Sequence, residues 1–168
     1  MTSTTAATPP TVHLLCGLNG AGKTTHARRL TEERRAVRFS LDEWMLRLHA
    51  ELRYDAPGYG ELAERCKALI WEVARQILAL DHDVILDWNG WSRARRATWR
   101  DLAREAGYDV VLHYVQVPLD VAIARADARA AANVAGAHRL DPDAIRHLAA
   151  LFEEPSGDEG MPIVRVQQ

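Results

Sequence analysis

The stretch Val12-His13-Leu14-Leu15-Cys16-Gly17-Leu18-Asn19-Gly20-Ala21-Gly22-Lys23-Thr24-Thr25 decides the fold. It predicts a short apolar strand, a glycine-rich turn and the start of a helix. Its residues Gly17, Gly22, Lys23 and Thr24 fill the pattern G-x-x-x-x-G-K-[ST]. Glycines let successive backbone N–H groups curl around an anion, and the following helix adds the positive end of its dipole. The stretch therefore predicts a phosphate-binding loop.

Each residue type in this loop has a predicted task. Lys23 is expected to reach the β- and γ-phosphates of ATP, and the Thr24 hydroxyl is expected to bind Mg²⁺. The cofactors predicted are therefore ATP and Mg²⁺. The residues predicted to hold the nucleotide are Gly17, Asn19, Gly20, Ala21, Gly22, Lys23, Thr24 and Thr25.

Length and composition indicate one ordinary globular domain. The chain has 168 residues, 48% apolar and 26% charged, with a formal net charge of −2. That charge argues against a protein that coats nucleic acid through a basic field, although a local basic groove is compatible with it. Cys16 and Cys66 fall in a predicted strand and a predicted helix, so no disulfide framework is expected.

The first residues of the chain predict a tail. Residues 1–10 are rich in Thr, Ala and Pro, and we expect a disordered tail there rather than a signal peptide. No apolar run approaches the ~20 residues of a membrane span. We therefore expect a cytoplasmic protein with a single domain over residues 11–168.

Predicted strands and helices alternate along the rest of the chain. Beyond the first strand, the strand candidates are 36–40, 84–87, 109–117 and 162–166, and the helix candidates are 24–34, 44–52, 61–80, 93–106, 119–132 and 141–152. In the helix 61–80 we expect the buried face to contain Leu62, Cys66, Leu69, Ile70, Val73, Ile77 and Leu80. The alternation predicts a parallel sheet with helices on both faces, the three-layer α/β class.

Two carboxylates follow predicted strands, where ligands of parallel sheets collect. Asp87 ends the apolar run 84–87 and is predicted to bind Mg²⁺ opposite Thr24, although acidic residues are common at strand ends. Asp42 follows the second strand and is predicted to accept the proton of an acceptor hydroxyl or to orient that hydroxyl. The alternative for Asp42 is a helix N-cap, and both roles are compatible.

Basic residues suggest a lid. Arg125 and Arg129 share a helix face, and the irregular stretch 133–140 follows them. A cationic lid over about 125–142 would stabilise charge on the transferred phosphoryl oxygens. A solvated charged face is the alternative.

A second basic run follows Asp87. It contains Arg93, Arg95, Arg96 and Arg100, and a solvated helix face is its usual interpretation. Arg93 is the member predicted to touch an anionic substrate. Trp88 and Trp91 are candidates for stacking on the acceptor, with packing as the equal alternative, whereas Trp71 and Trp99 are expected to be in the core or half-buried.

The order of these motifs resembles a known family. The phosphate-binding loop, Asp42, the run 84–96 and the Arg125/Arg129 pair resemble small P-loop kinases of the AAA-family ATPase or predicted-kinase type, relatives of polynucleotide kinases, zeta-toxin kinases and chloramphenicol phosphotransferases. The resemblance covers residues 12–155. It implies a P-loop NTPase fold with a five-stranded sheet in the order 2-3-1-4-5, a small helical lid and catalytic roles for Lys23, Asp42, Arg125 and Arg129. It also implies that Arg125 contacts the nucleotide and that a loop over 155–160 lies against adenine.

The sequence departs from its relatives at the acceptor side. Asn89-Gly90 stands where relatives carry Thr-Asn, and Trp88 and Trp91 flank it. The predicted substrate contacts are therefore Asp42, Trp88 and Arg93. The favoured function is an ATP- and Mg²⁺-dependent kinase acting on a small-molecule hydroxyl. A polynucleotide 5′-hydroxyl kinase and a nucleotide-dependent switch are the alternatives, and the acceptor, the choice between ATP and GTP, and the oligomeric state stay open.

Overall fold

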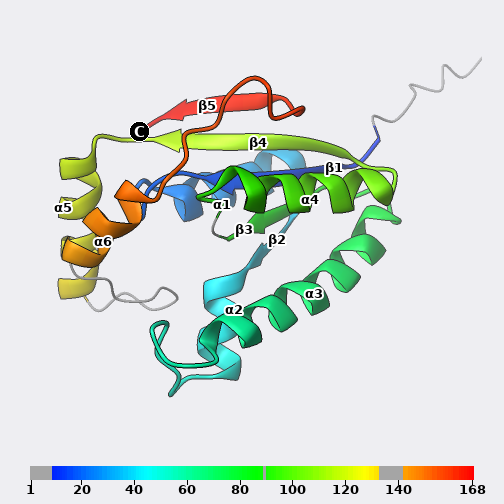
Figure 1. Ribbon diagram of the computed structural model, residues 1–168. Coiled ribbons are helices and arrows are strands. Elements are labelled where there is room, and N and C mark those ends of the chain that lie inside the picture. Colours follow the sequence, from blue (N-terminus) through cyan, green and yellow to red (C-terminus); the bar gives the residue numbers. More distant parts are fainter. Residues whose placement is uncertain (1–8, 89, 133–141) are drawn as a thin grey trace, which may run out of the picture.

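The computed structural model describes residues 9–88, 90–132 and 142–168, and its strands form one sheet (Figure 1). The strand order is β2-β3-β1-β4-β5, and all pairs are parallel. Both features confirm the predicted fold. The elements are β1 (Thr11–Cys16), α1 (Lys23–Arg34), β2 (Val37–Ser40), α2 (Leu41–Leu48), α3 (Tyr59–Leu78), β3 (Val84–Asp87), α4 (Arg93–Glu105), β4 (Asp109–Gln116), α5 (Leu119–Ala131), α6 (Pro142–Ala150) and β5 (Ile163–Gln167).

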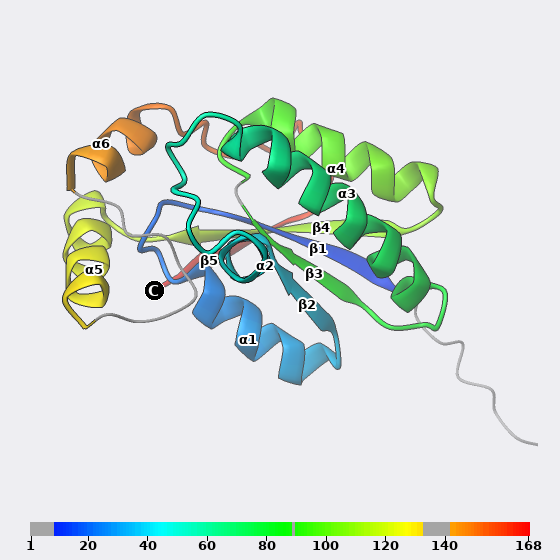
Figure 2. The same cartoon turned by 90° about the horizontal axis from the view of Figure 1, so that it is seen from below.

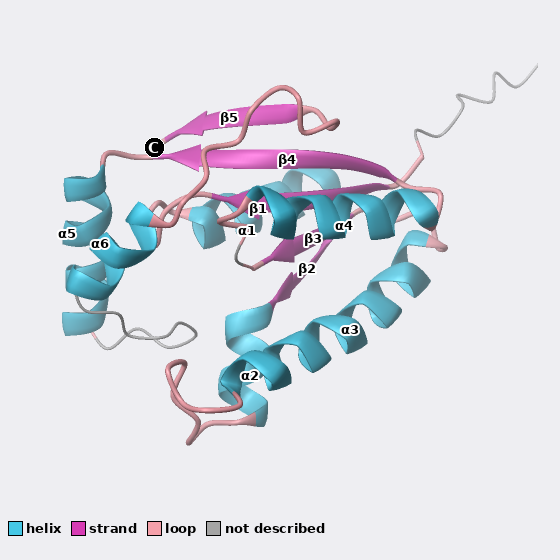
Figure 3. Ribbon diagram, in the orientation of Figure 1, coloured by secondary structure: helices cyan, strands magenta, loops and turns pink. Residues whose placement is uncertain are grey.

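The helices lie in two layers and at one end of the sheet. Figure 2 shows α1 on one face and α3 with α4 on the opposite face. The arrowheads of β4 and β5 point toward α5, so α5 and α6 lie beyond the carboxyl ends of the strands (Figures 1 and 3). The phosphate-binding loop leaves β1 at this same edge. Within the described ranges, no helix has the length and hydropathy that crossing a bilayer requires.

The larger core lies between the sheet and the α3/α4 layer. It contains apolar side chains from every strand and both helices, Ile70, Leu86 and Leu112 among them. Trp99 of α4 meets Trp71 and Trp88 edge-on, with ring centroids 6.1 and 4.7 Å apart. The predicted packing of Trp71 and Trp99 is confirmed, and both cysteines are buried free thiols.

The predicted buried face of α3 is partly wrong. Leu69, Val73 and Leu80 are exposed, Leu80 being 68% accessible. The buried residues of α3 include the predicted Cys66 and Ile70 together with Ala63, Lys67, Trp71, Ala74 and Leu78. Ala63 and Ala74 were missed because a search for large apolar residues overlooks alanines.

A chain of three buried histidines lies on the α1 face of the sheet. Nδ1 of His13 lies 3.0 Å from Nε2 of His113, and Nδ1 of His113 lies 3.0 Å from Nε2 of His26. Nε2 of His13 is 3.2 Å from a carboxylate oxygen of Asp83, and Nη2 of Arg29 is 3.3 Å from Nδ1 of His26. One assignment satisfies every contact: each neutral ring carries its proton on Nε2 and donates toward Asp83. A second proton on any ring would meet another donor, so the chain requires neutral histidines.

The histidine chain makes stability depend on pH. Burial lowers the pKa of His13 and His26, and burial together with the neighbouring histidines lowers that of His113 to about 3, from an ordinary value of 6.5. Asp83 raises the pKa of His13 without restoring it, and Arg34 lowers that of His13 and of His113. The unfolded chain gains these protons as pH falls and the folded chain does not, so lower pH favours unfolding.

We expect the free energy of unfolding to fall by about 2 kcal/mol for the three histidines together between pH 7.5 and pH 6. Urea unfolding at both values measures the change. His113→Met should shrink the pH dependence by about a third, whereas His147→Gln, at an exposed position on α6, should leave it unchanged. Equal unfolding free energies at both pH values in the wild type would contradict the expectation.

Candidate active site

The phosphate-binding loop is pressed against β4 and α5. Gly17 and Gly20 have positive φ angles of +139° and +86°. A Cβ on Gly17 would lie 2.3 Å from the carbonyl oxygen of Val115, and one on Gly20 would lie 2.1 Å from that of Ala122. Glycine is therefore required at both positions by conformation and by space. The glycines thus let the backbone of the loop curl while it lies directly against β4 and α5, as the predicted phosphate-binding loop requires.

Lys23 lies inside this loop at the start of α1. Its Nζ donates to the carbonyl oxygens of Gly17 and Leu18, both at 2.9 Å. Gly22 caps α1 in a left-handed conformation and, among the residues described, gives it neither a side-chain cap nor an acidic first turn. The positive end of α1 is thus left uncompensated beside the loop, where an anion is favoured. Thr24 is half-buried and Thr25 exposed on this first turn.

The electrostatics of Lys23 show which predicted residues gather around it. Burial lowers the pKa of Lys23, and the charges of Asp87 and Asp42 raise it. The charge of Arg129 lowers it. The structure therefore brings one residue from the end of β3, one from α2 and one from α5 close to the lysine. These are three of the residues that the sequence assigned to one site.

Asp42 lies on the exposed first turn of α2. Its N-cap alternative is wrong, because the helix begins at Leu41 and the hydroxyl of Ser40 accepts from the backbone N–H of Glu43 at 3.4 Å. The prediction that this helix starts at Trp44 is also wrong, because α2 already starts at Leu41. Burial and the charge of Asp42 together raise the pKa of Tyr59 to about 12. Asp42 thus stands between Lys23 and the start of α3, and its carboxylate is not used as the helix cap.

Asp87 ends β3 as predicted and is buried. The sheet register places it beside Ser40, the last residue of β2. One of its oxygens pairs with Arg38, a residue that the sequence analysis did not single out. The feature of the sequence that could have identified Arg38 is its charge inside a strand of only four residues. The remaining carboxylate oxygen and the Thr24 hydroxyl are oxygen ligands of the kind that Mg²⁺ prefers, so these residues fit the predicted metal.

The two lid arginines differ in their surroundings. Arg125 is exposed on α5, whereas Arg129 is half-buried and acts on Lys23. Helix α6 packs against α5 (Figure 1), and its side chain Ile145 is buried. The lid segment 133–141 and the tail residues 1–8 lie outside the described residues, so the lid and the disordered tail stay predictions.

The two tryptophans beside Asp87 have different surroundings. Trp88 is buried against Trp99, which is the packing alternative for this side chain. Trp91 is half-buried, with the guanidinium of Arg95 5.1 Å from its ring centroid. Trp91 also lines a small pocket next to the phosphate-binding loop. The pocket is formed by Gly17, Leu18, Asn19, Trp91, Leu148, Ala149 and Phe152.

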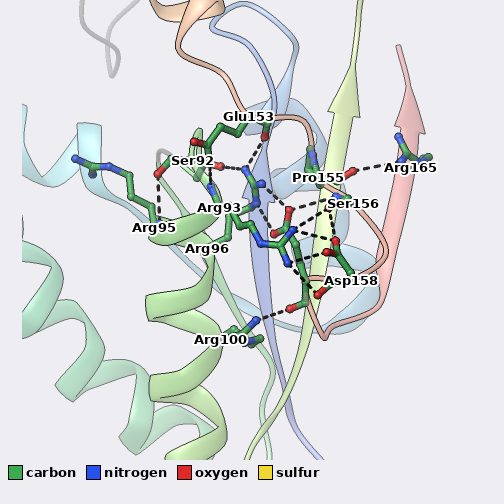
Figure 4. Close-up of polar contacts among 12 residues, drawn as sticks. Ser92, Arg93, Arg95, Arg96, Arg100, Glu153, Pro155, Ser156, Asp158 and Arg165 are labelled. Carbon is green, nitrogen blue, oxygen red and sulfur yellow. Dashed lines mark hydrogen bonds and ion pairs between the residues drawn. The ribbon is translucent and has the colours of Figure 1, made fainter.

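The basic run of α4 binds the loop before β5. Figure 4 shows Arg93, Arg96 and Arg100 directed at residues of this loop. Arg93 pairs with Asp158 at 2.9 Å, and the guanidiniums of Arg100 and Arg104 bond the carbonyls of Glu159 and Gly160. The predicted contact of Arg93 with substrate stays a prediction. The loop over residues 155–160 is bonded along α4. Its predicted contact with adenine stays a prediction.

The solvated-face interpretation is wrong for Arg96, whereas Arg93 and Arg95 of the same run are exposed. The Arg96 side chain is 1% exposed and forms a fork with Glu159, which is 2% exposed, at 2.6 and 2.7 Å. The same guanidinium donates to the carbonyls of Gly90 and Glu153, both at 2.9 Å. Arg96 therefore joins the segment after β3 to the segment after α6, on the side of the site where Trp91 lies.

A glycine-rich loop of this geometry, between the first strand of a 2-3-1-4-5 parallel sheet and its helix, defines a P-loop nucleotide-binding protein. The sequence profile of the AAA_33 family, described as an AAA domain, matches residues 12–155. The chain belongs to that family. The resemblance drawn from the motifs is confirmed at this level.

Solved structures share the fold at low sequence identity. Kti12 from Chaetomium thermophilum, in complex with ADP-AlF3, is 18% identical, with a TM-score of 0.70 over 94% of this chain and 89% of that one. A sugar kinase from Janibacter sp. HTCC2649 is 17% identical, with a TM-score of 0.66 over 95% and 86%. A chain of the Pnkp1/Rnl/Hen1 RNA repair complex is 21% identical, with a TM-score of 0.71 over 90% and 46%. No curated protein matches the chain.

Proposed function

We propose that the protein is an ATP- and Mg²⁺-dependent kinase that transfers the γ-phosphoryl group to a hydroxyl of a small molecule. One observation carries the proposal: the charges of Asp42 and Asp87 both act on the loop lysine, Lys23. A phosphate-binding loop alone needs no second carboxylate. A carboxylate on α2 facing that loop supplies what transfer to a hydroxyl requires, a group that accepts or orients the acceptor proton.

Each residue then has a defined task. Lys23 leaves the carbonyls of Gly17 and Leu18 and donates to phosphate oxygens. Asp42 holds the acceptor hydroxyl in line with the bond that breaks and takes its proton. Arg129, with Arg125, balances negative charge on the transferred group. Bound Mg²⁺ would supply charge neutralisation between the β- and γ-phosphates, with Thr24 and Asp87 as the residues that hold it.

A small molecule is the acceptor that we favour. The pocket beside the loop has an apolar wall of Trp91, Leu148 and Phe152, and Trp91 belongs to the segment after β3 where the acceptor contacts are predicted. The sugar kinase among the structural neighbours acts on a small molecule by its name, which agrees with this choice. ATP is the nucleotide that we propose, and the sequence carries no guanine-reading N-K-x-D motif of the GTPase type.

A polynucleotide 5′-hydroxyl kinase is the second candidate, since the Pnkp1 neighbour belongs to an RNA repair complex. It would need Arg93 to Arg100 for backbone phosphates. Arg96 is buried, and Arg93 is paired with Asp158. Oligonucleotide binding that falls steeply with salt would favour this candidate, and a flat response or no binding would remove it.

The test is transfer of labelled γ-phosphoryl from ATP to a panel of sugars, polyols, antibiotics and nucleosides, with Mg²⁺ present. We expect a labelled acceptor product with the wild type and none with Lys23→Met, which keeps the length of the side chain and loses its charge. A nucleotide-dependent protein partner together with no labelled product would favour the switch alternative and sink the kinase proposal.

A further inference from the structure

Arg38 of β2 connects the two halves of the candidate site through one guanidinium group. Its Nε donates to Oδ2 of Asp87 at 2.9 Å, and its Nη2 lies 2.8 Å from the same oxygen. Nη2 also donates to Oε1 of Glu43 at 2.9 Å. Asp87 ends β3, and Glu43 follows Asp42 on the first turn of α2. A single side chain therefore links the carboxylate beside the phosphates to the helical turn that carries the acceptor carboxylate.

The sheet dictates this placement. Arg38 pairs in register with Ile85, and Ser40 pairs with Asp87. Side chains two residues apart share a face of a strand, so Arg38 lies on the same face as Asp87 and one pleat behind it. The Arg38 side chain is 12% exposed and the Asp87 side chain 6%. Burial lowers the pKa of Arg38, but hydrogen bonds and charges from Glu43 and Asp87 outweigh it and the pKa is raised.

We propose that Arg38 is the positioning residue that orients the Asp87 carboxylate toward Mg²⁺ and fixes α2 relative to it. The inference rests on the proposed function. With Oδ2 held by Arg38, Oδ1 is the oxygen that turns toward the ion or its bound water. The bond to Glu43 keeps the guanidinium from rotating away, because leaving one carboxylate means leaving both. A partner of this kind commonly changes metal affinity by about 10- to 100-fold.

Two other roles are distinguishable from positioning. A purely structural contact would leave the metal dependence of nucleotide binding unchanged. A competing positive charge beside the ion would weaken the metal, so its removal would strengthen Mg²⁺-dependent binding. Of the three roles, only positioning predicts that removing the Arg38 side chain weakens Mg²⁺-dependent nucleotide binding.

The experiment measures binding of a non-hydrolysable ATP analogue by titration calorimetry, in Mg²⁺ and in EDTA. For Arg38→Met we expect affinity in Mg²⁺ to fall about tenfold while affinity in EDTA stays within about twofold of the wild type. Arg38→Lys keeps the charge but cannot bond both carboxylates as a fork. Its affinity in Mg²⁺ should lie between that of the wild type and that of Arg38→Met. Glu43→Gln, which weakens one arm, should show a smaller loss than Arg38→Met.

Arg28→Met is the matched control, since Arg28 reaches the same Glu43 at 3.7 Å from a position 68% exposed. An Mg²⁺-to-EDTA ratio for Arg38→Met equal to that of Arg28→Met overturns the proposal, and so does a higher Mg²⁺ affinity. Unchanged affinity in EDTA reports that the variant is folded. If Arg38→Met does not fold, Arg38→Lys and Glu43→Gln carry the same comparison. A wild-type protein that binds no nucleotide would contradict the proposed kinase function itself. That result is distinct from a failure of the Arg38 proposal.

Discussion

Replacing Arg96 by methionine is expected to lower the free energy of unfolding by about 3–5 kcal/mol. The change leaves Glu159 buried without its partner, and it removes the donors to the carbonyls of Gly90 and Glu153. Burial alone would raise the pKa of Glu159, and its bonds to Arg96 and to the backbone of Ser156 hold that pKa below its ordinary value. The loss should therefore be largest near neutral pH, where the carboxylate is charged. Urea unfolding followed by circular dichroism measures it.

Arg93 provides the matched control, because it lies on the same helix and pairs with the same loop. Its ion pair with Asp158 is exposed, the two side chains being 48% and 71% accessible. Arg93→Met should cost no more than about 1 kcal/mol. The double variant Arg96→Met/Glu159→Leu should recover much of the loss, because it removes the stranded charge. Equal losses for Arg93→Met and Arg96→Met would contradict the argument that burial sets the cost.

The different burial of Arg93 and Arg96 could not be predicted from the sequence. Arg93 and Arg96 stand in one basic run with no local sign that separates them. Their difference is set by Glu159, 63 residues further along the chain. The chain of His13, His26 and His113 is a similar case, since its contacts join residues 70 to 100 positions apart for all but the neighbours on α1. Long-range pairing of polar groups leaves no periodic pattern.

The fold itself was predictable because its signals are local. The glycine positions of the phosphate-binding loop, the apolar strands and the strand-helix alternation fix a parallel sheet with helices on both faces. Ser92 caps α4, its hydroxyl accepting from the N–H of Arg95 at 3.3 Å, and Gly107 follows its end with a φ of +87°. Both residue types are the ones that capping preferences favour at these positions. The strand order came from the family resemblance rather than from any local pattern.

The gathering of four predicted residues around the phosphate-binding loop was predictable from the sequence, and the side chains that contact them were less so. Lys23, Asp42, Asp87 and Arg129 each carry a charge at a strand end or helix position that topology brings to one edge. Arg38 was missed because it lies within a strand, where a charge reads as a surface residue. The pocket residues Leu148, on α6, and Phe152, just after it, were missed because an isolated apolar side chain in such a segment looks like core. Supports of a site are defined by neighbours in space, and these neighbours come from several elements.

Asp42→Asn is expected to reduce phosphoryl transfer to the acceptor by about 10²- to 10⁴-fold while nucleotide affinity stays nearly unchanged. Asparagine keeps the shape of the side chain and its ability to accept a hydrogen bond, but it cannot take the acceptor proton. The nucleotide contacts assigned to the loop do not involve this residue, so binding should persist. Removing its charge also removes one influence that raises the pKa of Lys23, and a small change in affinity would have that origin.

The measurement pairs transfer to the acceptor found in the screen with calorimetric titration of the non-hydrolysable analogue. Asp55→Asn is the control, because Asp55 is exposed and pairs with Arg53 away from the loop. We expect it to behave as the wild type in both assays. An Asp42→Asn enzyme that retains the wild-type rate removes Asp42 as base, and one that loses only acceptor affinity assigns Asp42 to binding of the acceptor. A rise in the KM for acceptor at unchanged kcat is therefore the sign that separates binding from proton transfer at this carboxylate.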